Sequence, residues 1–203
     1  MFIAPALSIW LYFRGHGLNK RTKNSFEGQI TSISINRING QFDQLWERRK
    51  MELPNTLLSE RSAEILRWHY DRSEVREENN VIILQAMQNK ELLGYLVLNR
   101  ADSKEIDLKR FRITDLFVSM DNKNVIDELL KKAFHLAKGE KVHLIETIGF
   151  PAWVRKRFLA TRPLSRTHSA PLFWYYTNDK SLARELSHSE AWYPTHFDGD
   201  SSL

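Results

Sequence analysis

The chain has 203 residues, of which 42% are hydrophobic and 27% are charged, so it holds enough apolar sequence for a sizeable core and disorder is not expected as its main state. Its 30 lysines and arginines against 25 acidic residues give a net charge of +5, which suits an anionic small molecule, nucleic acid or an acidic surface without selecting among them. The absence of cysteine excludes disulfides, thiolate zinc sites and cysteine nucleophiles. It fits a reducing compartment, and the cytoplasm is the expected location.

The N-terminal region differs from the rest of the chain. Residues 1–13 are apolar but interrupted by Pro5 and Ser8, and they are fewer than the roughly 20 apolar residues that span a bilayer. They also lack the basic start and the cleavage site of a signal peptide. Residues 14–25 are polar, basic and rich in turn formers, as in a linker. We therefore expect residues 1–27 to be an apolar segment and linker, packed on or left over from a preceding domain, and residues 28–203 to form the main domain.

The periodicity of apolar residues predicts a strand, two helices and then an antiparallel meander of three strands. The first two strands of the meander are separated by a polar connection of hairpin length at residues 89–91. The predicted elements, in chain order, are residues 29–36, 41–51, 62–70, 81–88, 92–99 and 110–119.

The clearest helix of the chain follows at residues 123–138, where apolar residues form one continuous stripe. Asp121 or Asn122 is expected to cap its start and Gly139 to stop it. Residues 141–147 form a strand directly after this helix, which predicts a βαβ unit with this strand parallel to residues 110–119. The remaining predicted elements are a helix at 151–160, a strand at 171–177 and a short helix at 181–187.

This order of elements resembles the GNAT acyltransferase fold. Five local phrases resemble the GNAT-type domains found in bacterial genes near surface-polysaccharide synthesis: FD-x-LW at 42–46, LRWHY at 66–70, GYLV at 94–97, ITDL at 113–116 and AWYP-x-x-FDGD at 191–200. The resemblance covers roughly residues 28–203. It implies an α+β fold of three layers (αβα), with a mixed, mostly antiparallel central sheet, flanking helices and one parallel βαβ unit.

The resemblance also implies where acyl-CoA would bind. Phe117 and Val118, at the end of strand 110–119, would hold pantetheine through backbone groups. The amides of Asn122, Lys123 and Asn124, with the Lys123 side chain, would hold the pyrophosphate at the helix N-terminus. The usual loop of the family contains glycines that allow close backbone approach, whereas residues 119–124 contain none.

An amine acceptor must lose a proton before its nitrogen can attack a thioester, so a base must lie within reach of that nitrogen. The resemblance points to Glu146 as this base and to Tyr176 as the acid that protonates the leaving thiolate. Trp68, Tyr70 and Asp115 are candidate acceptor-binding residues. Packing of a helix end against the sheet explains the first two equally well, and an acidic residue inside an apolar strand requires either a partner or a function.

We therefore expect an acyl-CoA-dependent N-acyltransferase that uses acetyl-CoA or another acyl-CoA as co-substrate. The acceptor would be an amino sugar or another small amine. With no cysteine and no Ser-His-Asp pattern, transfer would be direct, in a ternary complex. The alternative is a catalytically inactive GNAT-like binding or assembly module.

Other partners are not expected. The basic clusters at 14–23 and 155–157 suit phosphate contacts, but no helix-turn-helix, RNP or zinc-finger pattern accompanies them, so no nucleic-acid partner is expected. No metal is expected, because no histidine falls in a spacing such as H-E-x-x-H and the family phrase accounts for His196, Asp198 and Asp200. Membrane insertion is not expected either. Packing on a preceding domain and homodimerisation both stay open, as do the acyl chain and the acceptor.

Overall fold

The computed structural model describes residues 26–71, 81–165 and 175–198. The predicted apolar segment 1–13, the linker that follows it and residues 171–174 of the last predicted strand lie outside these ranges. In the part of the chain that is described, no helix is both long and apolar enough to cross a membrane.

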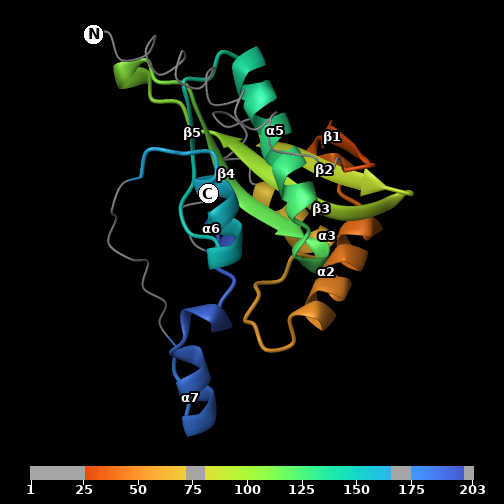
Figure 1. Ribbon diagram of the computed structural model, residues 1–203, viewed down its shortest axis with the longest axis vertical. Helices are drawn as coiled ribbons and strands as arrows, with labels where there is room; N and C mark the ends of the chain where they lie inside the picture. Colours follow the sequence, from red (N-terminus) through yellow and green to blue (C-terminus); the bar gives the residue numbers. More distant parts are fainter. Residues whose placement is uncertain (1–25, 72–80, 166–174, 199–203) are drawn as a thin grey trace.

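A five-stranded sheet forms the centre of the described structure, and its strands lie side by side in chain order (Figure 1). The first four strands pair antiparallel, and the fifth pairs parallel to the fourth. The strands are β1 (Gln29–Ile33), β2 (Val81–Gln88), β3 (Glu91–Arg100), β4 (Arg110–Val118) and β5 (Leu144–Glu146). This confirms the predicted mixed sheet with an antiparallel centre and one parallel pair.

Two layers of helix cover the sheet. The long helix α5 (Lys123–Gly139) packs on one face, where Leu84, Leu96 and Leu116 meet its apolar stripe. Helices α2 (Gly40–Glu52) and α3 (Ala63–Tyr70) pack on the opposite face, against aromatic residues of β3 and β4. Alternate residues of a strand point to opposite faces, so each central strand supplies both cores. The three-layer αβα architecture is therefore confirmed.

The helix ends follow the predicted capping chemistry. The Asn122 side chain accepts a hydrogen bond from the Val125 N–H and caps α5, so one of the two residues predicted for this role supplies a cap. Ser62 caps α3 through the N–H of Ile65 in the same way. Helix α5 includes Gly139 and so ends one residue beyond its predicted end at 138.

The C-terminal part departs most from the sequence prediction. Helices α6 (Ala152–Leu159) and α7 (Lys180–Leu186) form as predicted, and α7 projects away from the sheet (Figure 1). Residues 175–177 belong to no strand, so the strand predicted for 171–177 is wrong over its described part. β1 also ends three residues before its predicted end, at Ile33, because residues 35–37 form a 3₁₀ turn.

Gly94 allows close approach of β3 and β4. A Cβ atom on Gly94 would lie 2.5 Å from Cγ1 of Val118 and 3.0 Å from the carbonyl oxygen of Phe117. We expect Gly94→Ala to lower the free energy of unfolding by about 1–3 kcal/mol, the usual cost of overpacking.

Gly139→Ala is the matched control, since a Cβ there meets nothing within 4 Å. Its unfolding free energy should be unchanged or raised by up to about 1 kcal/mol, because alanine favours helix over glycine. Urea denaturation of both variants measures the difference. Equal effects would contradict close packing at Gly94.

Candidate active site

The parallel strands β4 and β5 stay paired over a short stretch only. Arg110, Phe111 and Arg112 of β4 pair with Leu144, Ile145 and Glu146, and β5 ends there while β4 continues to Val118. Just past this point the Thr147 hydroxyl donates to the Ile113 carbonyl at 3.4 Å. The edge of β4 from Leu116 to Val118 therefore lies beyond the last β5 pair.

Glu146 stands at the point where the pairing ends. One carboxylate oxygen accepts from Nε of Arg112 at 3.0 Å, and the other accepts from Nη1 of Arg110 at 3.4 Å. The Glu146 side chain retains 29% exposure. Two arginines thus hold the carboxylate in a fixed orientation while solvent still reaches it.

The C-terminal segment (residues 192–198) lies along this same edge of β4. The Tyr193 hydroxyl donates to the Leu116 carbonyl at 2.8 Å, and the N–H of Tyr193 donates to the Leu57 carbonyl at 3.0 Å. The Pro194 carbonyl accepts from the N–H of Phe150, a residue of the stretch that follows β5, at 2.7 Å. The segment therefore bridges β4 and the chain that leaves β5.

His196 is a titratable residue of the C-terminal segment. Its side chain is buried, and burial lowers its pKa; the Arg112 cation lowers it further, whereas the Glu146 carboxylate opposes this.

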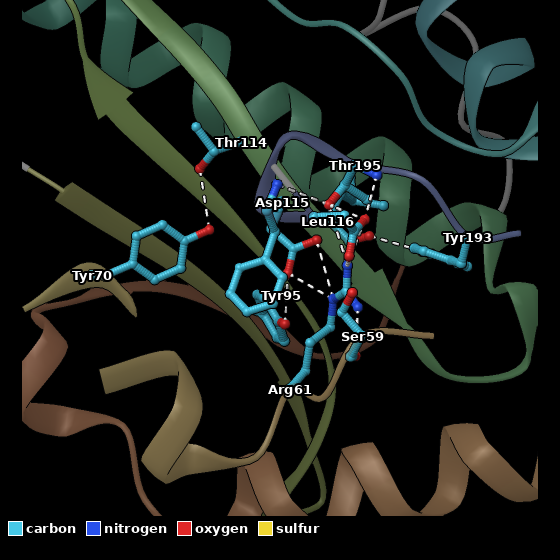
Figure 2. Close-up of polar contacts among 11 residues, drawn as sticks. Ser59, Arg61, Tyr70, Tyr95, Thr114, Asp115, Leu116, Tyr193 and Thr195 are labelled. Atoms are coloured by element: carbon cyan, nitrogen blue, oxygen red, sulfur yellow. Dashed lines mark hydrogen bonds and ion pairs between the residues drawn. The ribbon is translucent and has the colours of Figure 1, made fainter. Parts of the chain in front are cut away.

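A buried ionic network fastens the C-terminal segment to the sheet (Figure 2). Arg61 and Asp115 are both 0% exposed, and Nε of Arg61 donates to Asp115 at 3.1 Å. Nη2 of Arg61 donates to the Thr195 hydroxyl at 3.2 Å and to Asp198 at 3.3 Å. The Tyr95 hydroxyl donates to Asp115 at 2.8 Å. The network joins the stretch between α2 and α3, two central strands and the C-terminal segment.

A bulge in β4 aims Asp115 into this network. Val97 pairs with Asp115 and the next residue, Leu98, pairs with Ile113, so Thr114 is the extra residue. Thr114 and Asp115 both reach groups on the α2–α3 face, where the Tyr70 hydroxyl lies 3.3 Å from the Thr114 hydroxyl. Burial raises the pKa of Asp115 against the opposing effect of Arg61, and it raises the pKa of Tyr70 well above its ordinary value.

The loop between β4 and α5 holds a carboxylate from another helix. The Ser119 hydroxyl and the Met120 N–H donate to the two oxygens of Glu52, at 2.8 and 2.7 Å. Nη1 of Arg49 also donates to Glu52, at 2.7 Å. Burial would raise the pKa of Glu52, but these hydrogen bonds and the Arg49 charge lower it. Met120 has φ of 54°, so the loop reaches the left-handed conformation without a glycine.

The residues predicted to bind the acyl donor fall in two environments. The side chains of Phe117 and Val118 are 0% exposed and belong to opposite cores, so only their backbone groups remain for a ligand. Lys123 and Asn124 are exposed in the first turn of α5. The Asn122 N–H already donates to the Ser119 carbonyl, and its side chain caps the helix.

The residues predicted to bind the acceptor and to act as acid are likewise divided. The structure brings Tyr70 and Asp115 together in the buried network, where they are 1% and 0% exposed. Trp68, at the end of α3, is 58% exposed. Tyr176 is 88% exposed, precedes α7 and donates its hydroxyl proton to Asn178 at 2.9 Å. Among the described residues, no group of three or more His, Asp or Glu side chains is placed to hold a metal ion.

Sequence reasoning missed three participants: Arg61, Glu52 and Tyr193. Asp115 did signal that it needed a partner, because a lone charge in an apolar strand is costly. Nothing local identified Arg61 as that partner among 30 basic residues. Glu52 and Tyr193 lie 67 and 77 residues from the groups that they contact.

Of the comparisons with known proteins, only the comparison with solved structures finds matches. No family model matches the chain, and neither does any curated protein. Solved structures do match. One is a ribosomal-protein-alanine N-acetyltransferase from Brucella melitensis biovar Abortus 2308, at 12% identity and a TM-score of 0.53, over 74% of this chain and 100% of that one.

Two further acetyltransferases are similar. One is an aminoglycoside acetyltransferase from an uncultured soil metagenomic sample, in complex with sisomicin, at 13% identity and a TM-score of 0.51, over 74% of this chain and 97% of that one. The other is a predicted acetyltransferase with acetyl-CoA from Clostridium acetobutylicum, at 13% identity and a TM-score of 0.50, over 80% of this chain and 99% of that one. The chain therefore has the fold of GNAT acetyltransferases, as the resemblance of its sequence predicted.

Proposed function

We propose that the chain is an acyl-CoA-dependent N-acyltransferase that transfers an acetyl or other acyl group directly to a small amine. The observation that carries the proposal is the end of the β4–β5 pairing at Glu146, a solvent-reachable carboxylate beside the β4 edge. Helix α5 begins just after that edge and offers a helix N-terminus to an anionic group. A structural neighbour described as containing acetyl-CoA supports the choice of donor.

In this proposal each predicted residue has a defined part. The backbone of Phe117 and Val118 would align pantetheine, and Lys123 with the first amides of α5 would hold the diphosphate. The amine nitrogen attacks the thioester carbon, Glu146 accepts the amine proton, and the carbon–sulfur bond breaks. Tyr176 would return a proton to the thiolate.

The acceptor class rests on the resemblance to domains encoded near surface-polysaccharide synthesis, which favours an amino sugar. A neighbour in complex with the aminoglycoside sisomicin adds a second amine-bearing carbohydrate to test. Trp68 would offer an exposed aromatic face to such a ring, as aromatic side chains often do for sugars, while Tyr70 and Asp115 would shape the site from beneath.

A binding module without catalysis is the second candidate, and two contacts favour it. The Leu116 carbonyl already accepts a hydrogen bond from the Tyr193 hydroxyl. The donors of the β4–α5 loop already donate to the Glu52 carboxylate. Both contacts would have to open before a long ligand could lie along β4 and into the loop.

Calorimetry with acetyl-CoA, followed by thiol-release assays with glucosamine, sisomicin and spermidine, tests the two candidates. We expect acetyl-CoA to bind at micromolar to millimolar concentration and one amine to release CoA. Binding to the native state must also raise the melting temperature. Binding without thiol release would favour the module, and no binding at millimolar acetyl-CoA would overturn the enzyme proposal.

A further inference from the structure

We propose that Glu52 is an internal anion that fills a phosphate subsite in the β4–α5 loop, and that a diphosphate takes this subsite when Glu52 leaves. Identification of the ligand as the diphosphate of acyl-CoA rests on the proposed function. The subsite itself is argued from the contacts of Glu52 alone.

Three donors converge on one carboxylate. The Ser119 hydroxyl, the Met120 N–H and the Arg49 guanidinium approach the two Glu52 oxygens at 2.7–2.8 Å. Hydrogen bonds with an ionised partner are short and strong, and these donors would serve phosphate oxygens equally well. A hydroxyl, a backbone amide and an arginine together form the donor set that proteins use for phosphates.

The arginine of this set is buried in the protein interior. Arg49 is 1% exposed, and its guanidinium lies 5.7 Å from the centre of the Trp153 ring. Departure of Glu52 removes one acceptor from a buried guanidinium, which is unfavourable. An incoming anion at the same position would restore the lost interaction, so exchange of one anion for another is the favoured outcome.

Glu52 itself occupies a position from which it can leave. It is the last residue of α2, and the following residue, Leu53, has a non-helical conformation. The Glu52 side chain is 20% exposed, so solvent reaches it. A carboxylate at a helix C-terminus is also opposed by the helix dipole, by roughly 0.3–1 kcal/mol. Arg49 of α2 and the loop donors Ser119 and Met120 together hold Glu52 in place.

Binding of inorganic pyrophosphate to the full chain tests this subsite. Titration calorimetry should show Glu52→Ala binding pyrophosphate roughly tenfold more tightly than the wild type, because a competing carboxylate has been removed. Ser119→Ala in the Glu52→Ala background should take back part of that gain. Glu47→Ala is the control, since Glu47 lies on the same helix in an exposed pair with Lys50, and its affinity should match the wild type.

Glu52→Gln serves if Glu52→Ala does not fold, because glutamine keeps the volume and one acceptor oxygen but removes the charge. It should also bind pyrophosphate more tightly than the wild type. Unchanged affinity in a folded Glu52 variant would overturn the subsite. Gain of pyrophosphate binding without any acyl transfer would instead keep the subsite and reject the proposed enzyme.

Discussion

Asp115→Ala should lower the free energy of unfolding by about 3–5 kcal/mol, the usual cost of breaking a buried ion pair. Its partner Arg61 is 0% exposed and would keep its charge in the interior. The Tyr95 hydroxyl would also lose its acceptor. Urea denaturation, followed by tryptophan fluorescence and circular dichroism, measures the loss.

Two controls separate charge from packing. Asp115→Asn keeps the volume and an acceptor for Tyr95, so it isolates the loss of the negative charge. Glu128→Ala removes a partly exposed carboxylate paired with Lys131 on α5 and should cost no more than about 1 kcal/mol. A cost for Asp115→Ala as small as that of Glu128→Ala would show that the network does not hold the fold together.

The network explains why the C-terminal segment belongs to the domain. Asp198 and Thr195 reach Arg61 across more than 130 positions of the chain, so their attachment is a tertiary contact that no local pattern contains. Local signals did predict the sheet and α5. The short apolar runs of β2 to β4 correspond to strands that are mostly buried, and the apolar stripe of α5 corresponds to its buried face.

The predicted strand 171–177 is wrong over residues 175–177, because an aromatic run can form either a strand or an irregular segment. Residues 175–177 continue an aromatic run that is typical of a strand, but Tyr175 and Tyr176 are exposed and lie beside α7. A run of β-prone residues forms a strand only if a sheet edge is free to pair with it. The described part of the β4 edge instead meets Tyr193 of the C-terminal segment.

The candidate site likewise contains residues that the sequence predicted and residues that it did not. Asp115 was predicted to need either a partner or a function, because burial of a charge imposes this requirement in any fold, and Arg61 is its partner. Glu52 is different, because an acidic residue at the end of a helix is ordinarily solvated. Its pair with Arg49 is local, but its donors Ser119 and Met120 come from a distant part of the chain.

Glu146→Gln should lower the turnover number by about 10²–10⁴-fold in the proposed transfer, the range expected when a general base is lost. Glutamine preserves the size of the side chain and still accepts from Arg112, so the end of β5 should keep its structure. The KM for acetyl-CoA should change little, because the change affects proton removal from the amine and not the binding of the donor.

Glu140→Gln is the matched control, since Glu140 is also a glutamate paired with an arginine, Arg100, but lies at the end of α5 with 42% exposure. Its turnover number should equal that of the wild type. Steady-state thiol-release kinetics give both constants. Full activity of Glu146→Gln would show that Glu146 is not the base.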